Sequence, residues 1–60
     1  MKELTEWDVK YALEAIERAQ NALRLATREI RVDHTPRAGM ALDEASQSIS
    51  AALSWIGYGD

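Results

Sequence analysis

From Val9 to Ile30 the chain carries a heptad pattern that neither proline nor glycine interrupts. Proline occurs once, at Pro36, and the three glycines stand at positions 39, 57 and 59. Apolar residues spaced alternately three and four apart lie on one side of an α-helix, so we expect a first helix over about residues 5–32. Its apolar seam consists of Val9, Ala12, Ile16, Ala19, Leu23, Ala26 and Ile30.

Residues that favour helix ends frame this segment and a second one. Thr5 is a good N-cap, and Asp8 three positions later completes a short capping box. A turn is expected over about residues 33–36, with Thr35 as the cap and Pro36 at the first helical position, where its missing N–H costs nothing. The second helix is expected over about residues 37–56, and Gly57 is placed to end it in the left-handed conformation.

The second segment repeats the seam, and the order of large and small residues along the two seams predicts how they meet. In two antiparallel helices, residues that face each other have numbers that add to a constant, and each facing pair forms one layer of the contact. Here every layer pairs a branched residue with an alanine. Layers of nearly constant volume let two helices pack closely, so we predict an all-α fold, an antiparallel helical hairpin with an alanine-rich heptad seam. The predicted layers are Ile30–Ala38, Ala26–Leu42, Leu23–Ala45, Ala19–Ile49, Ile16–Ala52 and Ala12–Ile56.

A hairpin of 60 residues without cysteine needs another source of stability. A domain of this size buries only about 60% of its unfolded surface, and the chain has neither a disulfide nor a Cys/His cluster that could bind zinc. The apolar arc of the first helix is also wider than one neighbouring helix covers. We therefore expect a homodimer, a four-helix bundle, that packs through Ala15, Ala22, Leu25, Val32, Ala41 and Ser48.

Charge is expected to separate along such a hairpin. Residues 1–17 hold five acidic residues against two lysines, whereas residues 18–37 hold five arginines against Glu29 and Asp33. Guanidinium groups match phosphates and carboxylates, which makes a candidate anion-binding cluster of Arg24, Arg28, Arg31 and Arg37. The alternative is that these cations complement the dipole at the C-terminal end of the first helix.

All four aromatic residues are expected at the open end of the hairpin, opposite the turn. Tryptophan and tyrosine offer a large contact area with few rotatable bonds and often anchor interfaces. The candidate protein-binding residues are Leu4, Trp7, Tyr11, Trp55 and Tyr58. The alternative is that Tyr11, Trp55 and Tyr58 plug the end of the bundle.

The residue types needed for catalysis are scarce. His34 is the only histidine, and no phosphate-binding glycine loop or helical metal-ligand pattern is present, so we expect no enzymatic activity, cofactor or metal. No segment approaches the roughly 18 apolar residues that span a membrane, and the first residues are charged where a secretory signal is apolar. These features predict a cytoplasmic protein that does not bind membranes.

Three functions are compatible with this sequence. The first is a small protein-binding regulator or inhibitor that acts through helix 1 and the aromatic end. The second is an RNA-binding protein, which a resemblance suggests. In length, acidity and hairpin plan the chain is similar to the family of plasmid copy-number regulators represented by Rop, which are RNA-binding dimers of helical hairpins. That resemblance implies RNA binding by the arginines near the turn, although it includes no shared motif and transfers no RNA-contacting residue. The third is a purely structural oligomerisation module.

Overall fold

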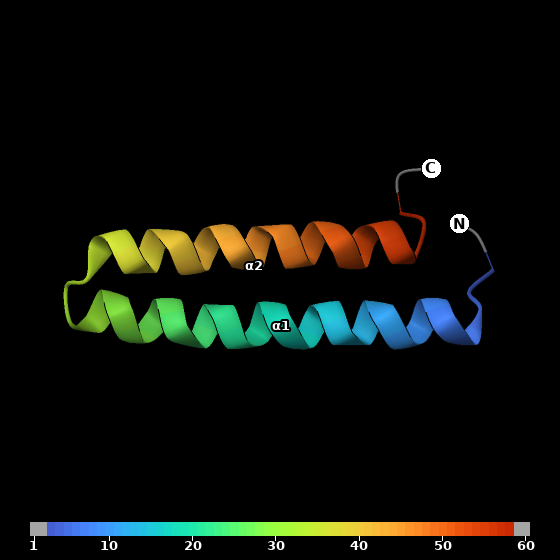
Figure 1. The fold of residues 1–60 in the computed structure, drawn as a ribbon, viewed down its shortest axis with the longest axis horizontal. Coiled ribbons are helices and arrows are strands. Elements are labelled where there is room, and N and C mark those ends of the chain that lie inside the picture. The colour runs from blue at the N-terminus through green and yellow to red at the C-terminus, as the bar shows by residue number, and fades with distance from the viewer. Residues whose placement is uncertain (1–2, 59–60) are drawn as a thin grey trace.

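The computed structural model describes residues 3–58, so both ends of the expected 1–60 domain, residues 1–2 and 59–60, lie outside the described residues. Over that range the chain forms two helices, α1 (Glu6–Arg31) and α2 (Thr35–Trp55), and no strand. The helices lie side by side and antiparallel, with a short turn at one end and the start of α1 beside the end of α2 at the other (Figure 1). The hairpin measures 43 × 19 × 11 Å. This confirms the predicted helical hairpin.

The capping box at the start of α1 is confirmed. The Thr5 hydroxyl accepts a hydrogen bond from the Asp8 backbone N–H at 3.1 Å, and the Asp8 carboxylate accepts one from the Thr5 backbone N–H at 3.0 Å. Two of the N–H groups that a helix start leaves unpaired are thereby satisfied. The acidic residues Glu6 and Asp8 in this first turn also favour the positive end of the helix dipole.

Helix α1 ends in a Schellman motif built on an aspartate. Asp33 has a positive φ of 60°, and its N–H donates to the Ile30 carbonyl at 3.1 Å, while the His34 N–H donates to the Glu29 carbonyl at 2.8 Å. Left-handed backbone geometry is uncommon for residues other than glycine, although aspartate tolerates it better than most. The turn therefore carries a small conformational cost at Asp33.

Helix α2 ends in the same motif, this time with the predicted glycine. Gly57 has a φ of 72°, and its N–H donates to the Ser54 carbonyl at 3.1 Å. The Tyr58 N–H donates to the Leu53 carbonyl, also at 3.1 Å. Gly57 thus ends α2 in the left-handed conformation, as expected from the sequence.

The predicted start of α2 is wrong by a residue or two. The helix begins at Thr35, and the N-cap is His34, whose side chain makes no capping hydrogen bond. The His34 carbonyl instead accepts the first bond of the helix, from the Ala38 N–H at 3.0 Å. Because the Schellman motif at Asp33 already reverses the chain, the new helix starts at once, and Pro36 stands within its first turn, where no N–H is needed.

Alanine forms the contact between the two helices. In the described part of the chain no large side chain is fully buried, and the only buried polar residues are Glu29 and Ser48. A methyl group is the smallest side chain that still packs, so the helix backbones approach closely along this stripe, which we call the alanine seam. The buried apolar residues are Ala12, Ala15, Ala19, Ala22, Ala26, Ala38, Ala41, Ala45 and Ala52.

The predicted burial of a branched residue in each layer is therefore wrong. Only the alanine of each layer is buried, and the opposing branched residues are exposed or, at Ile56, half-buried. The seam is rotated so that it includes Ala15 and Ala22 on α1 and Ala41 and Ser48 on α2. The physical reason is that these positions extend the alanines into a continuous stripe at steps of three and four, which permits a closer approach than isoleucine or leucine does.

Replacement of Asp33 by glycine is expected to stabilise the hairpin. Glycine has no Cβ to strain a φ of 60°, so the free energy of unfolding should rise by about 0.5–1 kcal/mol even after the entropy that glycine adds to the unfolded chain. Denaturant unfolding at one fixed protein concentration measures this change. The matched control is Gly57→Ala, which should lose a comparable amount, and a destabilised Asp33→Gly variant would contradict the explanation.

Candidate interaction surfaces

Eight branched aliphatic residues lie together on one side of the alanine seam. The four on α1 are spaced seven residues apart, and on α2 a second row runs beside the first, so both rows keep to one side of their helices. With the exception of the half-buried Ile56, all of them are exposed in the hairpin. This surface, hereafter the aliphatic face, consists of Val9, Ile16, Leu23, Ile30, Leu42, Ile49, Leu53 and Ile56.

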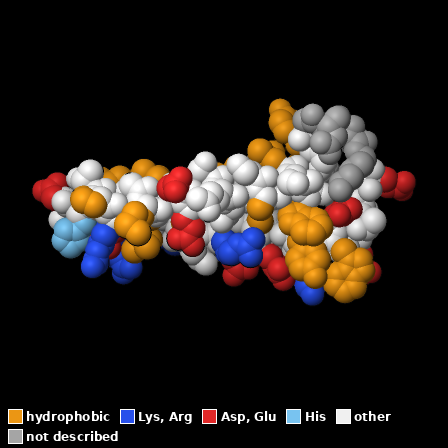
Figure 2. Space-filling view, turned by 45° about the horizontal axis from the view of Figure 1, so that its top comes forward, with side chains coloured by type: hydrophobic (Ala, Val, Ile, Leu, Met, Phe, Trp, Pro, Cys, Tyr) orange, Lys and Arg blue, Asp and Glu red, His pale blue; other side chains and the backbone are white. Residues whose placement is uncertain are grey.

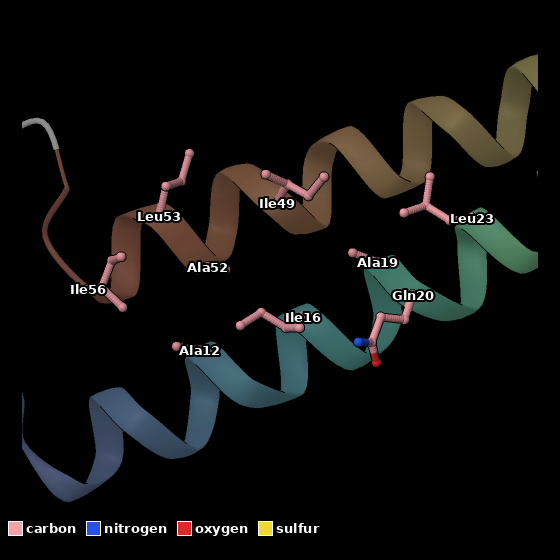
Figure 3. Close-up of a pocket in the computed structure, with 9 residues that line it drawn as sticks. All are labelled: Ala12, Ile16, Ala19, Gln20, Leu23, Ile49, Ala52, Leu53 and Ile56. Carbon is pink, nitrogen blue, oxygen red and sulfur yellow. The ribbon is translucent and has the colours of Figure 1, made fainter.

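A shallow apolar groove of about 360 Å³ runs along the centre of the aliphatic face. Ile16 and Leu23 border it from α1, and Ile49, Leu53 and Ile56 border it from α2, with seam alanines between them (Figure 3). Gln20 is the single polar residue among those that line it. The groove therefore offers shape and apolar contact but almost no hydrogen-bonding groups.

Three aromatic rings form a continuous stack at the open end of the hairpin. The ring centroids of Trp7 and Tyr11 are 6.1 Å apart with an interplanar angle of 20°, and those of Tyr11 and Trp55 are 5.0 Å apart at 29°. The Lys10 ammonium lies 5.4 Å from the centre of the Trp7 ring and 5.8 Å from that of Tyr11. We call Trp7, Tyr11 and Trp55 the aromatic stack. It joins the start of α1 to the end of α2.

The outer ring of the stack is open to solvent. Trp7 is 64% exposed and Trp55 39% exposed, whereas Tyr11 between them is half-buried. Figure 2 shows large apolar side chains gathered at the end opposite the turn. The other two predicted protein-binding residues, Leu4 and Tyr58, are also exposed at this end but lie outside the stack.

Most of the residues predicted for the dimer interface lie inside the hairpin instead. Ala15 is 0% exposed, and Ala22, Ala41 and Ser48 are also buried between α1 and α2 of one chain, so they are not accessible to a second copy. Leu25 and Val32 are exposed, but their helical positions lie on the other side of the seam from the aliphatic face. The sequence signal that identifies the seam is the run of alanines at steps of three and four.

The arginines predicted to bind anions occupy two different places. Arg24, Arg28 and Arg31 are exposed on the outer side of α1, where the Arg24 guanidinium donates a 2.8 Å hydrogen bond to the side-chain oxygen of Asn21. Arg37 belongs to α2 and borders a depression beside Leu25, Glu29 and Met40. Basic side chains are visible next to the histidine at the turn end (Figure 2).

The turn is held by a side-chain contact that the sequence did not reveal. His34 Nδ1 donates a hydrogen bond of 2.8 Å to Oε2 of the buried Glu29. Glu29 thus has a polar partner at the point where the seam reaches the turn, as a buried carboxyl group requires. His34 therefore contributes to the structure of the turn through its side chain as well as through its backbone.

Residues 3–58 hold no group of three or more His, Cys, Asp or Glu side chains placed to bind a metal ion. Neither α1 nor α2 has a stretch apolar enough to cross a membrane. Comparisons of the chain with family models, with curated proteins and with solved structures gave no significant match. The surfaces described above are therefore the basis for a functional proposal.

Proposed function

We propose that the protein is a non-enzymatic helical-hairpin module that acts by binding proteins. The aliphatic face binds a second copy of the chain, giving a four-helix bundle, and the aromatic stack binds a different protein, which is thereby regulated or inhibited. One observation carries the proposal: the large apolar side chains lie outside the core of the single hairpin, whose buried apolar residues in the described range are all alanines.

The energetics of the aliphatic face favour a second copy as its occupant. Fully burying a Val, Leu or Ile side chain contributes about 1.5–3 kcal/mol, against about 0.8 kcal/mol for one methyl or methylene group. A single hairpin gains only the smaller contribution at its seam positions. The hairpin as a whole extends over 43 × 19 Å on this side, a footprint of roughly 800 Å², and each partner in a standard protein interface buries about that area.

The aromatic stack supports the second binding role. It is distant from the turn and is built from rings that are already ordered by stacking. These rings would therefore lose little side-chain entropy when a partner binds. Exposed tryptophan and tyrosine are the residue types most often found at the energetic centre of protein interfaces. Because Trp7 and Tyr11 lie outside the aliphatic face, they remain open when two hairpins pack through that face.

Trp7→Ala and Tyr11→Ala are expected to abolish capture of the partner. With the tagged 60-residue chain as bait in an extract of its native cells, each variant should retain at least tenfold less of the protein that the unaltered chain retains, since losing a central aromatic anchor costs about 2 kcal/mol or more. The matched control is Met40→Ala, another exposed apolar residue of the hairpin. Circular dichroism should show unchanged helicity, and undiminished capture by both variants would contradict this role.

A further inference from the structure

We infer that two copies pack their aliphatic faces head to tail, so that the turn end of each hairpin lies beside the open end of the other. This inference rests on the proposed self-association and specifies its geometry. Two hairpins that pack face to face can be related by a two-fold axis along the helices, which puts both turns at one end. The alternative is a two-fold axis across the helices, which puts the turns at opposite ends. The positions of the apolar and charged residues favour the axis across the helices.

The aliphatic residues of α1 are symmetric under reversal of the helix. An axis across the helices packs α1 against α1 of the second copy in the antiparallel direction. Because Val9, Ile16, Leu23 and Ile30 are evenly spaced, reversal places Val9 opposite Ile30 of the second copy and Ile16 opposite Leu23. The midpoint of this set lies between Ile16 and Leu23.

The aliphatic residues of α2 have the same property about a midpoint at the same height. Reversal places Leu42 opposite Ile56 of the second copy and Ile49 opposite its own counterpart. Ile49 lines the same groove as Ile16 and Leu23 (Figure 3), so the two midpoints lie side by side in the hairpin. A single axis across the helices therefore brings both rows into register.

Charges along the outer border of α1 complement one another in this arrangement. Glu6 and Glu17 lie on the half of that border near the open end, and Arg24 and Arg31 lie on the half near the turn. Reversal about the same midpoint brings Glu17 close to Arg24 of the second copy and Glu6 close to Arg31. Within residues 3–58 these four exposed side chains form no ion pair in their own chain, so they are available for such pairs.

Lys10 lies on the same outer side of α1 and does not oppose this pairing. Its ammonium group is directed to the rings of Trp7 and Tyr11, away from the aliphatic face. The axis along the helices would instead place the border of α1 next to that of α2, where the exposed residues Gly39, Ser46 and Ser50 carry no charge. It would also bring the two arginine-rich turn ends together, which like-charge repulsion disfavours.

Spin-label distances distinguish the two arrangements. The chain has no cysteine, so Arg37→Cys and Ser50→Cys each provide one labelling site, near the turn and near the middle of α2. A label at residue 37 should lie about 40 Å from its counterpart in the head-to-tail dimer, close to the 43 Å length of the hairpin. In the other arrangement the distance should be about 20–25 Å, or two helix diameters. A label at residue 50 lies near the middle of α2 and should give less than about 25 Å in both, since packed helices are about 8–10 Å apart.

Each result of this experiment has a definite meaning. A dipolar signal at residue 50 together with a long distance at residue 37 supports the inference. A signal at residue 50 with a short distance at residue 37 overturns the head-to-tail arrangement but leaves self-association intact. No dipolar signal at either site, with a monomer mass by light scattering, overturns self-association itself.

Charge reversal provides an independent readout. Glu17→Arg and Arg24→Glu alone should each weaken the dimer severalfold in sedimentation equilibrium, because each converts two attractive contacts per dimer into repulsive ones. The double variant should recover most of the lost affinity. Single variants that dimerise as tightly as the unaltered chain would overturn the proposed pairing.

Discussion

An Ala15→Leu variant is expected to lose about 3 kcal/mol of its free energy of unfolding, the upper part of the range for overpacked cores. Ala15 is completely buried between α1 and α2, and a leucine there can be accommodated only if the helix axes move apart. Leucine is nearly as good a helix former as alanine, so the loss reports on the contact between helices. Denaturant unfolding followed by circular dichroism at one protein concentration measures it.

The matched control for this variant is Ala51→Leu. Ala51 is half-buried at the border of the seam on α2, where a larger side chain can turn toward solvent. Its stability should change by less than about 1 kcal/mol. An Ala15→Leu variant as stable as the unaltered chain would contradict the claim that the alanine seam is needed for the close approach of the two helices.

The second large effect is expected for Ile49→Glu, which should abolish self-association. In the head-to-tail dimer Ile49 lies at the two-fold axis, so the substitution introduces two carboxylates into one apolar contact without a cationic partner. Burying unpaired charge costs several kcal/mol, and about 4 kcal/mol corresponds to a roughly thousandfold rise in Kd. Sedimentation equilibrium should therefore show a monomer at concentrations where the unaltered chain is a dimer.

Ser54→Glu is the control, because it adds the same charge to an exposed position of α2 outside the aliphatic face. It should dimerise like the unaltered chain, and the melting temperature of both should rise with protein concentration. The melting temperature of Ile49→Glu should be lower and independent of concentration. An Ile49→Glu variant with unchanged dimer affinity would show that the aliphatic face is not the contact.

The local features of the hairpin could be predicted from sequence because short-range interactions determine them. The capping box at Thr5 and Asp8 and the left-handed Gly57 depend on residues within one turn of the helix end. The left-handed Asp33 could not be predicted in the same way. Aspartate tolerates the left-handed conformation, but its presence in a sequence does not predict it. The hydrogen bond between Glu29 and His34 depends on the end of α1 and the turn already having their final positions.

The sequence pattern did not determine how each helix is rotated about its own axis. Ala12, Ala19 and Ala26 belong to both possible seams, one completed by Ile16 and Leu23 and the other by Ala15 and Ala22. Apolarity alone favours the branched residues, because they gain more from burial. The hairpin instead packs through the alanines, and Ile16 and Leu23 stay exposed on the aliphatic face.

The candidate surfaces were predicted in part. The positions of the aromatic residues in the sequence of an antiparallel hairpin were enough to predict that they lie near the open end. The stacking of Trp7, Tyr11 and Trp55 depends on side-chain orientations, which the sequence does not give. The aliphatic face could not be separated from the seam until the helix rotation was known. Arg37 illustrates the same limitation, since it is close to the other arginines in sequence but belongs to a different helix.

The alanine seam also has a kinetic consequence. Alanine has no side-chain rotamers to lose, so closing the two helices against each other costs backbone entropy alone. The chain segments that meet are joined by a very short turn, and helical proteins with such local topology fold in microseconds to milliseconds. At micromolar concentrations, encounter between two chains at typical association rates takes longer than this, so each hairpin should close before it meets another.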